Sequence, residues 1–95
     1  MQYLALMHAE PRVKTLDKDW NNFFQLAENS GIFRGGSEIN NSKIIGTAKG
    51  DPIGNKVVGY MRFDCDDKDK LLELLKQHPL VLSGGKVELF EMPLS

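Results

Sequence analysis

The sequence has too few cysteines and histidines for a disulfide framework or a zinc site. Cys65 is the one cysteine among 95 residues, and His8 and His78 are the two histidines. We therefore expect no metal and no cofactor. A chain of this length buries only roughly 60–65% of its unfolded surface. With disulfides and metals excluded, a partner subunit is the expected source of additional buried area.

The sequence also lacks an excess of charge and any long apolar run. Twelve basic and thirteen acidic residues give a net charge of −1, without the basic stripe that nucleic-acid binding requires. No run approaches the roughly 20 apolar residues of a membrane span. Residues 1–7 are apolar but lack a preceding basic segment, which favours a strand over a signal peptide. We expect one soluble, cytoplasmic domain over residues 1–95, without nucleic-acid or membrane partners.

The hydrophobic pattern predicts strands separated by two helices. The predicted strands cover residues 3–8, 32–39, 43–48, 57–64 and 86–92, with a helix as the weaker alternative for the first. Gly35-Gly36 indicates a bulge, and Asn40-Asn41 is a turn that would join the second and third strands as a hairpin. Residues 49–56 are rich in turn formers and predict a mobile loop.

Two stretches have helical spacing. The first has an apolar stripe, predicted to be core against the sheet, made of Leu16, Trp20, Phe23, Phe24 and Ala27. Thr15 or Asp17 is its expected N-cap, and Gly31 its expected end. The second helix is predicted over residues 68–78, capped by Asp66 or Asp67 and ended by Pro79.

This order of elements predicts an α+β, ferredoxin-like βαββαβ sheet with both helices on one face. The strands nevertheless carry apolar residues on both faces. In the first strand, Leu4 and Leu6 alternate with Ala5 and Met7. Two helices cannot cover two faces, so the uncovered apolar face predicts association. Face-to-face packing of two identical sheets around a two-fold axis is the simplest arrangement, and we expect a homodimer.

Ordered segments along nearly the whole chain resemble the YCII-related proteins, most closely their DGPF-domain branch. The segments are Met1-Gln2-Tyr3-Leu4-Ala5-Leu6-Met7, Gly31-Ile32-Phe33-Arg34-Gly35-Gly36, Val58-Gly59-Tyr60-Met61-Arg62-Phe63, His78-Pro79 and Ser83-Gly84-Gly85-Lys86-Val87-Glu88-Leu89. The resemblance implies a dimeric α/β barrel, formed by two ferredoxin-like sheets that pack through their open faces.

Two features depart from the pattern of that family. The signature Asp-Gly-Pro-Phe is replaced by Gly50-Asp51-Pro52-Ile53, and the loop that follows is shorter. The YCII branch proper is thought to use a histidine on its first helix with a later aspartate, and Trp20 falls near that histidine position. The resemblance therefore implies no such dyad here, which weakens the case for that chemistry.

Six polar residues are candidates for a site. Arg34, beside Gly35-Gly36, is placed to hold a carboxylate or phosphate, with a surface ion pair as the alternative. Tyr60 and Arg62 share a strand face, which lines either the barrel or the core. The weaker, catalytic candidates are His8, Asp51 and His78, for which strand-end, turn and helix-cap roles are favoured.

Two functions of different classes follow. In the first, a homodimer binds a small polar or acidic molecule in a cleft of the barrel. In the second, the protein is a non-catalytic interaction or regulatory module whose dimer surface is the functional element. An isomerase, lyase or cofactor-free oxygenase is supported by analogy of fold alone. A barrel filled by Tyr3, Met7, Val58 and Met61 would favour the second function.

Overall fold

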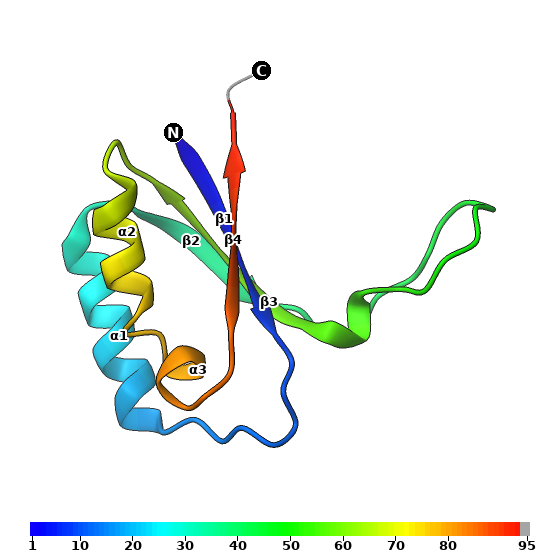
Figure 1. The fold of residues 1–95 in the computed structure, drawn as a ribbon, viewed down its shortest axis with the longest axis horizontal. Helices are drawn as coiled ribbons and strands as arrows, with labels where there is room; N and C mark the ends of the chain where they lie inside the picture. Colours follow the sequence, from blue (N-terminus) through cyan, green and yellow to red (C-terminus); the bar gives the residue numbers. More distant parts are fainter. Residues whose placement is uncertain (94–95) are drawn as a thin grey trace.

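The computed structural model describes residues 1–93 and has the expected ferredoxin-like α+β fold (Figure 1). Four strands form one antiparallel sheet in the order β2-β3-β1-β4. The strands are β1 (Gln2–His8), β2 (Phe33–Glu38), β3 (Val57–Asp64) and β4 (Val87–Met92). The helices are α1 (Asp17–Ser30), α2 (Lys68–Leu75), the short α3 (Pro79–Leu82) and a 3₁₀ turn, η1 (Gly54–Lys56).

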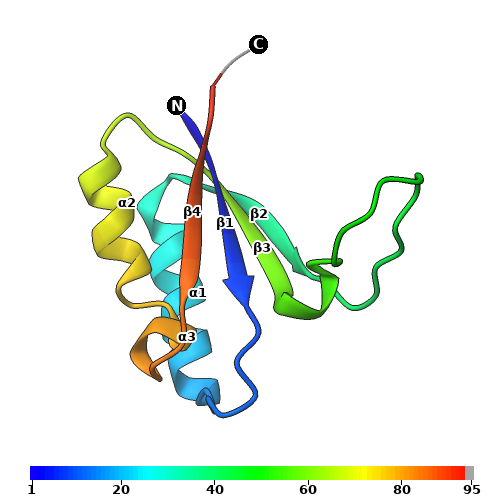
Figure 2. The ribbon, with the colours of Figure 1, turned by 45° about the vertical axis from the view of Figure 1, so that its right-hand side comes forward.

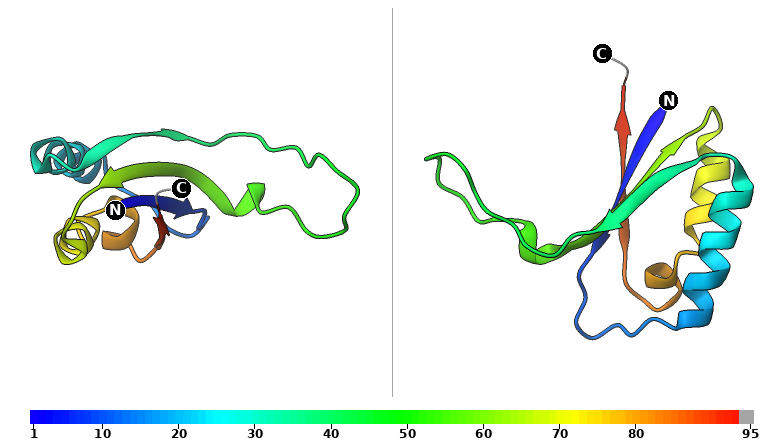
Figure 3. Two further views of the ribbon diagram at one scale, coloured as in Figure 1. Left: turned by 90° about the horizontal axis from the view of Figure 1, so that it is seen from above. Right: turned by 180° about the vertical axis from the view of Figure 1, so that it is seen from behind.

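All three α-helices lie on one side of the sheet, as predicted. Figures 2 and 3 show α1 and α2 side by side on that side, with α3 below them. The other face of the sheet, here called the open face, is covered by no element among residues 1–93. The shortest extent of the molecule, 18 Å, runs across the four strands, along the direction of view in Figure 1.

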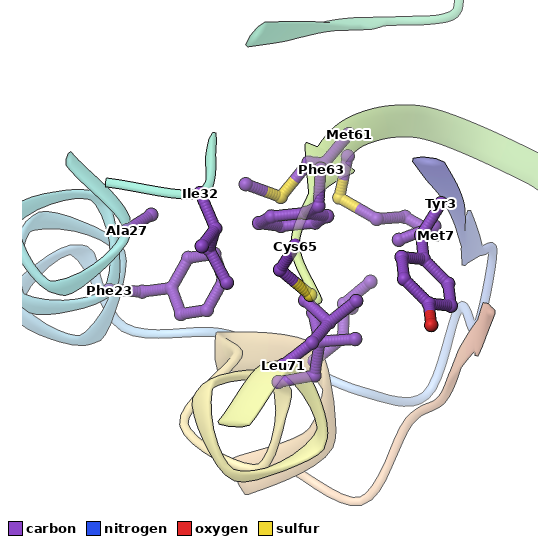
Figure 4. Packing of buried hydrophobic residues seen from close by; sticks show 12 residues of the cluster. Tyr3, Met7, Phe23, Ala27, Ile32, Met61, Phe63, Cys65 and Leu71 are labelled. Atoms are coloured by element: carbon purple, nitrogen blue, oxygen red, sulfur yellow. The ribbon is translucent and has the colours of Figure 1, made fainter. Parts of the chain in front are cut away.

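The core lies between the sheet and the helices. Figure 4 shows Tyr3 and Met7 of β1, and Met61 and Phe63 of β3, pointing toward the helices. Their strand neighbours point to the open face, because successive side chains alternate between the faces of a strand. In β3 this alternation leaves Tyr60 and Arg62 on the open face, which settles the choice that the sequence left open.

The first helix begins and ends for local reasons. Gly31 has φ 76° and closes α1 in the left-handed conformation, as predicted. The predicted cap was wrong: Leu16 is the N-cap and no side chain caps the helix. Asp17 and Asp19 in the first turn instead interact favourably with the helix dipole.

The strand β2 contains the expected bulge. Its pairing with β3 shifts between Phe33 and Gly36, and Gly35 has φ 101°, a conformation that other residues rarely adopt. At Gly36 the strands approach so closely that a Cβ atom would clash with the carbonyl oxygen of Tyr60. Both glycines are therefore required by the backbone of this edge.

The predicted strand over residues 43–48 was wrong. Phe33–Glu38 pairs with Val57–Asp64, so the hairpin has one long connection rather than a short turn and a third strand. Residues 39–53, here called the arm, contain no helix or strand and project away from the domain (Figure 1). Ile44 and Ile45 are adjacent in sequence and both exposed, and Gly46 has φ 119°, so no partner strand holds this segment.

The second predicted helix also divides in two. α2 ends at Leu75, and Pro79 begins α3 rather than only ending the helix before it. Proline is favoured at the first position of a helix, where its missing N–H has no partner to lose. Asp67, one of the two predicted caps, accepts hydrogen bonds from the backbone of Asp69 and Lys70.

Candidate functional site

A cleft of about 360 Å³ lies between α1 and the β2 edge of the sheet. Its apolar wall is formed by Met7, Trp20, Phe24, Phe33 and Met61. Its polar rim includes Ser37, Glu38 and Tyr60. An apolar cleft of this size with a few polar groups is typical of a small-molecule site.

Two aromatic rings from α1 stack on each other in the wall of this cleft. The ring centroids of Trp20 and Phe24 are 5.7 Å apart and the rings are inclined by 26°, an offset-stacked arrangement. The Trp20 indole N–H donates a 2.8 Å hydrogen bond to Thr15 Oγ1. Thr15, predicted as a helix cap, therefore orients the indole instead.

The exposure of these rings differs from the sequence-based expectation that the whole stripe is core. Phe23 is fully buried, whereas Phe24 is 43% exposed and Trp20 is half-buried. Helical periodicity identifies the apolar side of α1, but it cannot tell which residues extend past the edge of the sheet. The less buried rings, Trp20 and Phe24, are the ones that line the cleft.

Glu38 contributes the one carboxylate on the cleft wall, and its orientation depends on the bulge. In a regular strand Glu38 would point opposite to Phe33, because the two residues are an odd number of positions apart. The bulge at Gly35 inserts one residue, so Glu38 pairs with Gly59 on the helix side of the sheet. Among residues 1–93 no hydrogen bond or ion pair engages its carboxylate, which is exposed at the rim.

A second hollow, of about 400 Å³, shares Met7, Trp20 and Glu38 with the first. It extends the cleft toward Ile39 and Asn40, the first residues of the arm. Gly59 leaves room for the Met7 side chain at this point, since a Cβ there would clash with the Met7 methyl group. The root of the arm therefore borders the cleft.

Of the predicted ligand-binding residues, Tyr60 alone lines the cleft, although its side chain lies on the open face. Arg62 lies on the open face and is exposed. Arg34 donates hydrogen bonds to the carbonyl oxygens of Gly31 and Phe33, at 3.0 and 3.2 Å, and so supports the end of α1. It forms no ion pair among the described residues, so the surface ion pair considered as its alternative role is absent there.

The three weaker candidates lie in three different places. His8 Nε2–H donates a 2.8 Å hydrogen bond to Glu88 Oε1, beside the open face. Asp51 is exposed in the arm, outside the cleft and its extension. His78 is fully buried, and its Nδ1 accepts a hydrogen bond from the backbone N–H of Leu80 at 3.1 Å, so it caps α3.

Burial determines the protonation state of His78. Burial lowers the pKa of His78 to about 4, so the imidazole is neutral at pH 7. Its ring lies edge-on to Trp20 and Phe23, with centroids 5.1 and 4.8 Å away. His78 thus supports the aromatic wall from behind.

Two features that would indicate a function are absent from residues 1–93. No helix in this range is long and apolar enough to cross a bilayer. No three His, Cys, Asp or Glu side chains in it are grouped so as to hold a metal ion.

Comparisons with known proteins show that the fold of this chain is shared with a solved structure. No family model and no curated protein matches the sequence. A solved structure, the 5-chloro-2-hydroxyhydroquinone dehydrochlorinase of Burkholderia phenoliruptrix AC1100 in complex with 2,5-dihydroxybenzoquinone, is similar to this chain with a TM-score of 0.59. The match covers 100% of this chain and 96% of that one, at 11% sequence identity. Such a likeness shows a shared fold, and it extends over the whole chain.

Proposed function

We propose that the protein binds a small aromatic molecule bearing an O–H or N–H donor in the cleft beside α1. The observation that carries this proposal is the presence, in one cleft, of two stacked aromatic rings, Trp20 and Phe24, and of a carboxylate without a partner in residues 1–93, Glu38. A ring can stack on the first while its donor group bonds to the second. The dihydroxybenzoquinone bound by the similar structure is likewise a small planar six-membered ring with oxygen substituents.

This ligand class differs from the acidic molecule expected from sequence. That expectation rested on Arg34 and Arg62, and neither side chain is on the cleft wall. A carboxylate at the rim disfavours an anionic ligand, since like charges repel. We therefore propose a neutral or cationic donor, and we propose binding rather than a reaction.

The test follows Trp20, the one tryptophan of the chain, through its indole N–H signal in a nitrogen–proton NMR spectrum. Hydroquinone should shift this signal saturably, and benzoate should bind more weakly. Glu38→Ala should weaken hydroquinone binding about tenfold, the effect of losing one hydrogen bond to a charged group. Glu28→Ala is the matched control, because Glu28 is exposed on α1 and does not line the cleft.

Three outcomes would contradict the proposal. One is an indole signal that hydroquinone does not move. Another is an equal loss of affinity in Glu38→Ala and Glu28→Ala. The third is tighter binding of benzoate than of hydroquinone.

We also propose that two copies associate through their open faces. The strand pairing places Tyr60, Leu6 and Glu88 in one row across the open face. Arg62, Leu4 and Phe90 form the next row. The two leucines lie on the central strand, and Phe90 is 40% exposed. An apolar centre flanked by polar groups is the usual composition of an interface.

The polar groups of the open face are complementary to a second copy of themselves. A two-fold axis parallel to β1 would place each row opposite the same row of the second copy. The order of the residues would be reversed, so that a β3 residue faces a β4 residue. Tyr60 would then face Glu88 of the second copy, as hydroxyl donor to carboxylate, and Arg62 would face Phe90, as cation to ring. Leucine would pack on leucine at the centre. This self-complementarity supports a homodimer over an unrelated partner.

Sedimentation velocity tests the dimer, which we expect at micromolar concentration. Leu6→Lys should give a folded monomer, because the axis brings the two substituted positions together and equal charges repel. Leu72→Lys is the control, since Leu72 is exposed on α2, away from the open face. A monomeric wild-type protein with a folded far-UV circular dichroism spectrum would contradict the proposal.

Membership of the YCII-related, DGPF-type family is part of this proposal. The shared fold and the ordered motifs of the chain support it. A cytoplasmic location is also proposed. Cys65 is a free, buried thiol, as is common in proteins from a reducing compartment.

A further inference from the structure

The arm, residues 39–53, has a direction and a composition that its own domain does not explain. Figure 1 and the left view of Figure 3 show the helices on one side of the sheet and the arm extending on the other. The arm thus projects on the side of the open face. A second copy that packs on that face would lie beside it.

The arm carries large apolar side chains that nothing in residues 1–93 covers. Ile44 is 53% exposed, Ile45 is 92% exposed and Ile53 is 65% exposed. Scattered exposed apolar residues are ordinary on a protein surface, but three isoleucines on one projecting segment are a cluster that favours association.

The backbone of the arm is also largely unpaired within the described chain. Ile39 donates to Val58 at the root, and Ile53 accepts from Lys56 at the return. Between these two points no backbone hydrogen bond joins residues 40–52 to one another or to the rest of residues 1–93. A segment with so few contacts is stabilised in one conformation only when it packs on something else.

We infer that the arm of each copy packs against the second copy, beside the beginning of its β4. The inference rests on the dimer proposed above. The two-fold axis parallel to β1 reverses the order of strands, so the β4 edge of the second copy lies over the β2–β3 side of the first. The arm leaves the sheet on that side, at the end where β3 begins.

The surface at that place suits the arm. β4 begins at Val87, directly after a turn that includes Gly84 and Gly85. A hollow of about 330 Å³ lies there, lined by His8, Ala9, Glu10, Gly84, Gly85 and Lys86. Glu10 and Lys86 have charges opposite to Lys43 and Asp51 of the arm, so polar residues can pair around the isoleucines.

The placement implies a functional link with the cleft. Ile39 and Asn40 both border the cleft and form the root of the arm. An arm held by the second copy would hold this border in place, whereas a free arm would leave it mobile. The dimer would then organise both clefts, one through each arm.

Disulfide cross-linking tests the placement directly. In a Cys65→Ala background, the pair Ile45→Cys and Lys86→Cys should form a covalent dimer on mild oxidation. The control pair, Ile45→Cys and Lys76→Cys, should not, because Lys76 follows α2 on the helix side of the sheet. Equal cross-linking of both pairs, or none with the first pair, would overturn the inference.

A second measurement separates the arm from the dimer itself. Replacing Ile44, Ile45 and Ile53 with serine should raise the dimer dissociation constant at least about tenfold. A control with serine at Leu72, Val81 and Leu82, which are exposed on the helix side, should leave it unchanged. If the wild-type protein is dimeric and the arm variant dissociates at the same concentration, the arm inference fails while the proposed dimer stands. A monomeric wild type overturns both.

Discussion

His78 shows how one buried imidazole links the pH of the solution to folding. Its Nδ1 accepts the Leu80 N–H, so the proton of the neutral ring is on Nε2, which has no hydrogen-bond partner in the described chain. The ring lies in T-shaped contact with Trp20 and Phe23, so its surroundings on this side are apolar. A charged ring would have no anion to pair with.

The free energy of unfolding should therefore fall as the pH is lowered from about 6.5 to about 4. The unfolded imidazole takes up a proton near pH 6.5, whereas the folded one does so only near pH 4, so protons favour the unfolded state in that window. The difference corresponds to about 3 kcal/mol. Urea denaturation at several pH values measures it.

His78→Asn provides the control for this prediction. Asparagine retains a side-chain oxygen that can cap α3, but it does not titrate. Its stability should change less between pH 6.5 and 4 than that of the wild type, since only the carboxylates remain to respond. Parallel curves for the two proteins would contradict the assignment of the effect to His78.

At the scale of single residues, the sequence predicted which side chains share a face of a strand, but it did not predict the residues of the cleft. The alternation in β3 correctly placed Tyr60 and Arg62 on one face, because strand periodicity alone determines it. Glu38 was missed, although the bulge that orients it was predicted from Gly35-Gly36. Counting residues through that bulge would have placed Glu38 on the side of Phe33, which is the signal that was available.

At the scale of elements, the start of α2 depends on one side chain. Asp67 accepts from the backbone N–H groups of Asp69 and Lys70, at 3.0 and 3.4 Å. Asp67→Ala should lower the free energy of unfolding by about 1 kcal/mol, the usual effect of losing an N-cap. Asp66→Ala is the control, because Asp66 is exposed and does not cap the helix. Chemical denaturation checks the difference, and equal losses would contradict it.

Elements with strong periodicity were predictable, and the arm was not. β1, α1 and β3 have many apolar residues at regular spacing, so pattern alone locates them. Residues 43–48 were mistaken for a strand because a short apolar run looks the same whether or not another strand pairs with it. Pairing is a tertiary property, and β3 already has β2 and β1 as its two neighbours.

At the scale of the whole molecule, the order of elements was enough to predict the sheet topology. Right-handed crossovers around a hairpin leave few other arrangements. The cleft was beyond such reasoning, since it depends on how far α1 extends past the β2 edge. The arm was beyond it as well, because its direction follows from the twist that β2 and β3 carry past the rest of the sheet.

The two edge strands of this sheet, β2 and β4, have features that disfavour pairing with a further strand and so disfavour fibre formation. At one edge, the bulge at Gly35 interrupts the regular spacing of backbone donors and acceptors that another strand would need. At the other edge, β4 carries Glu88 and Glu91, and like charges would meet if two such edges paired. Each edge thus discourages the addition of a further strand. Association along the edges, which could continue without limit, is thereby disfavoured.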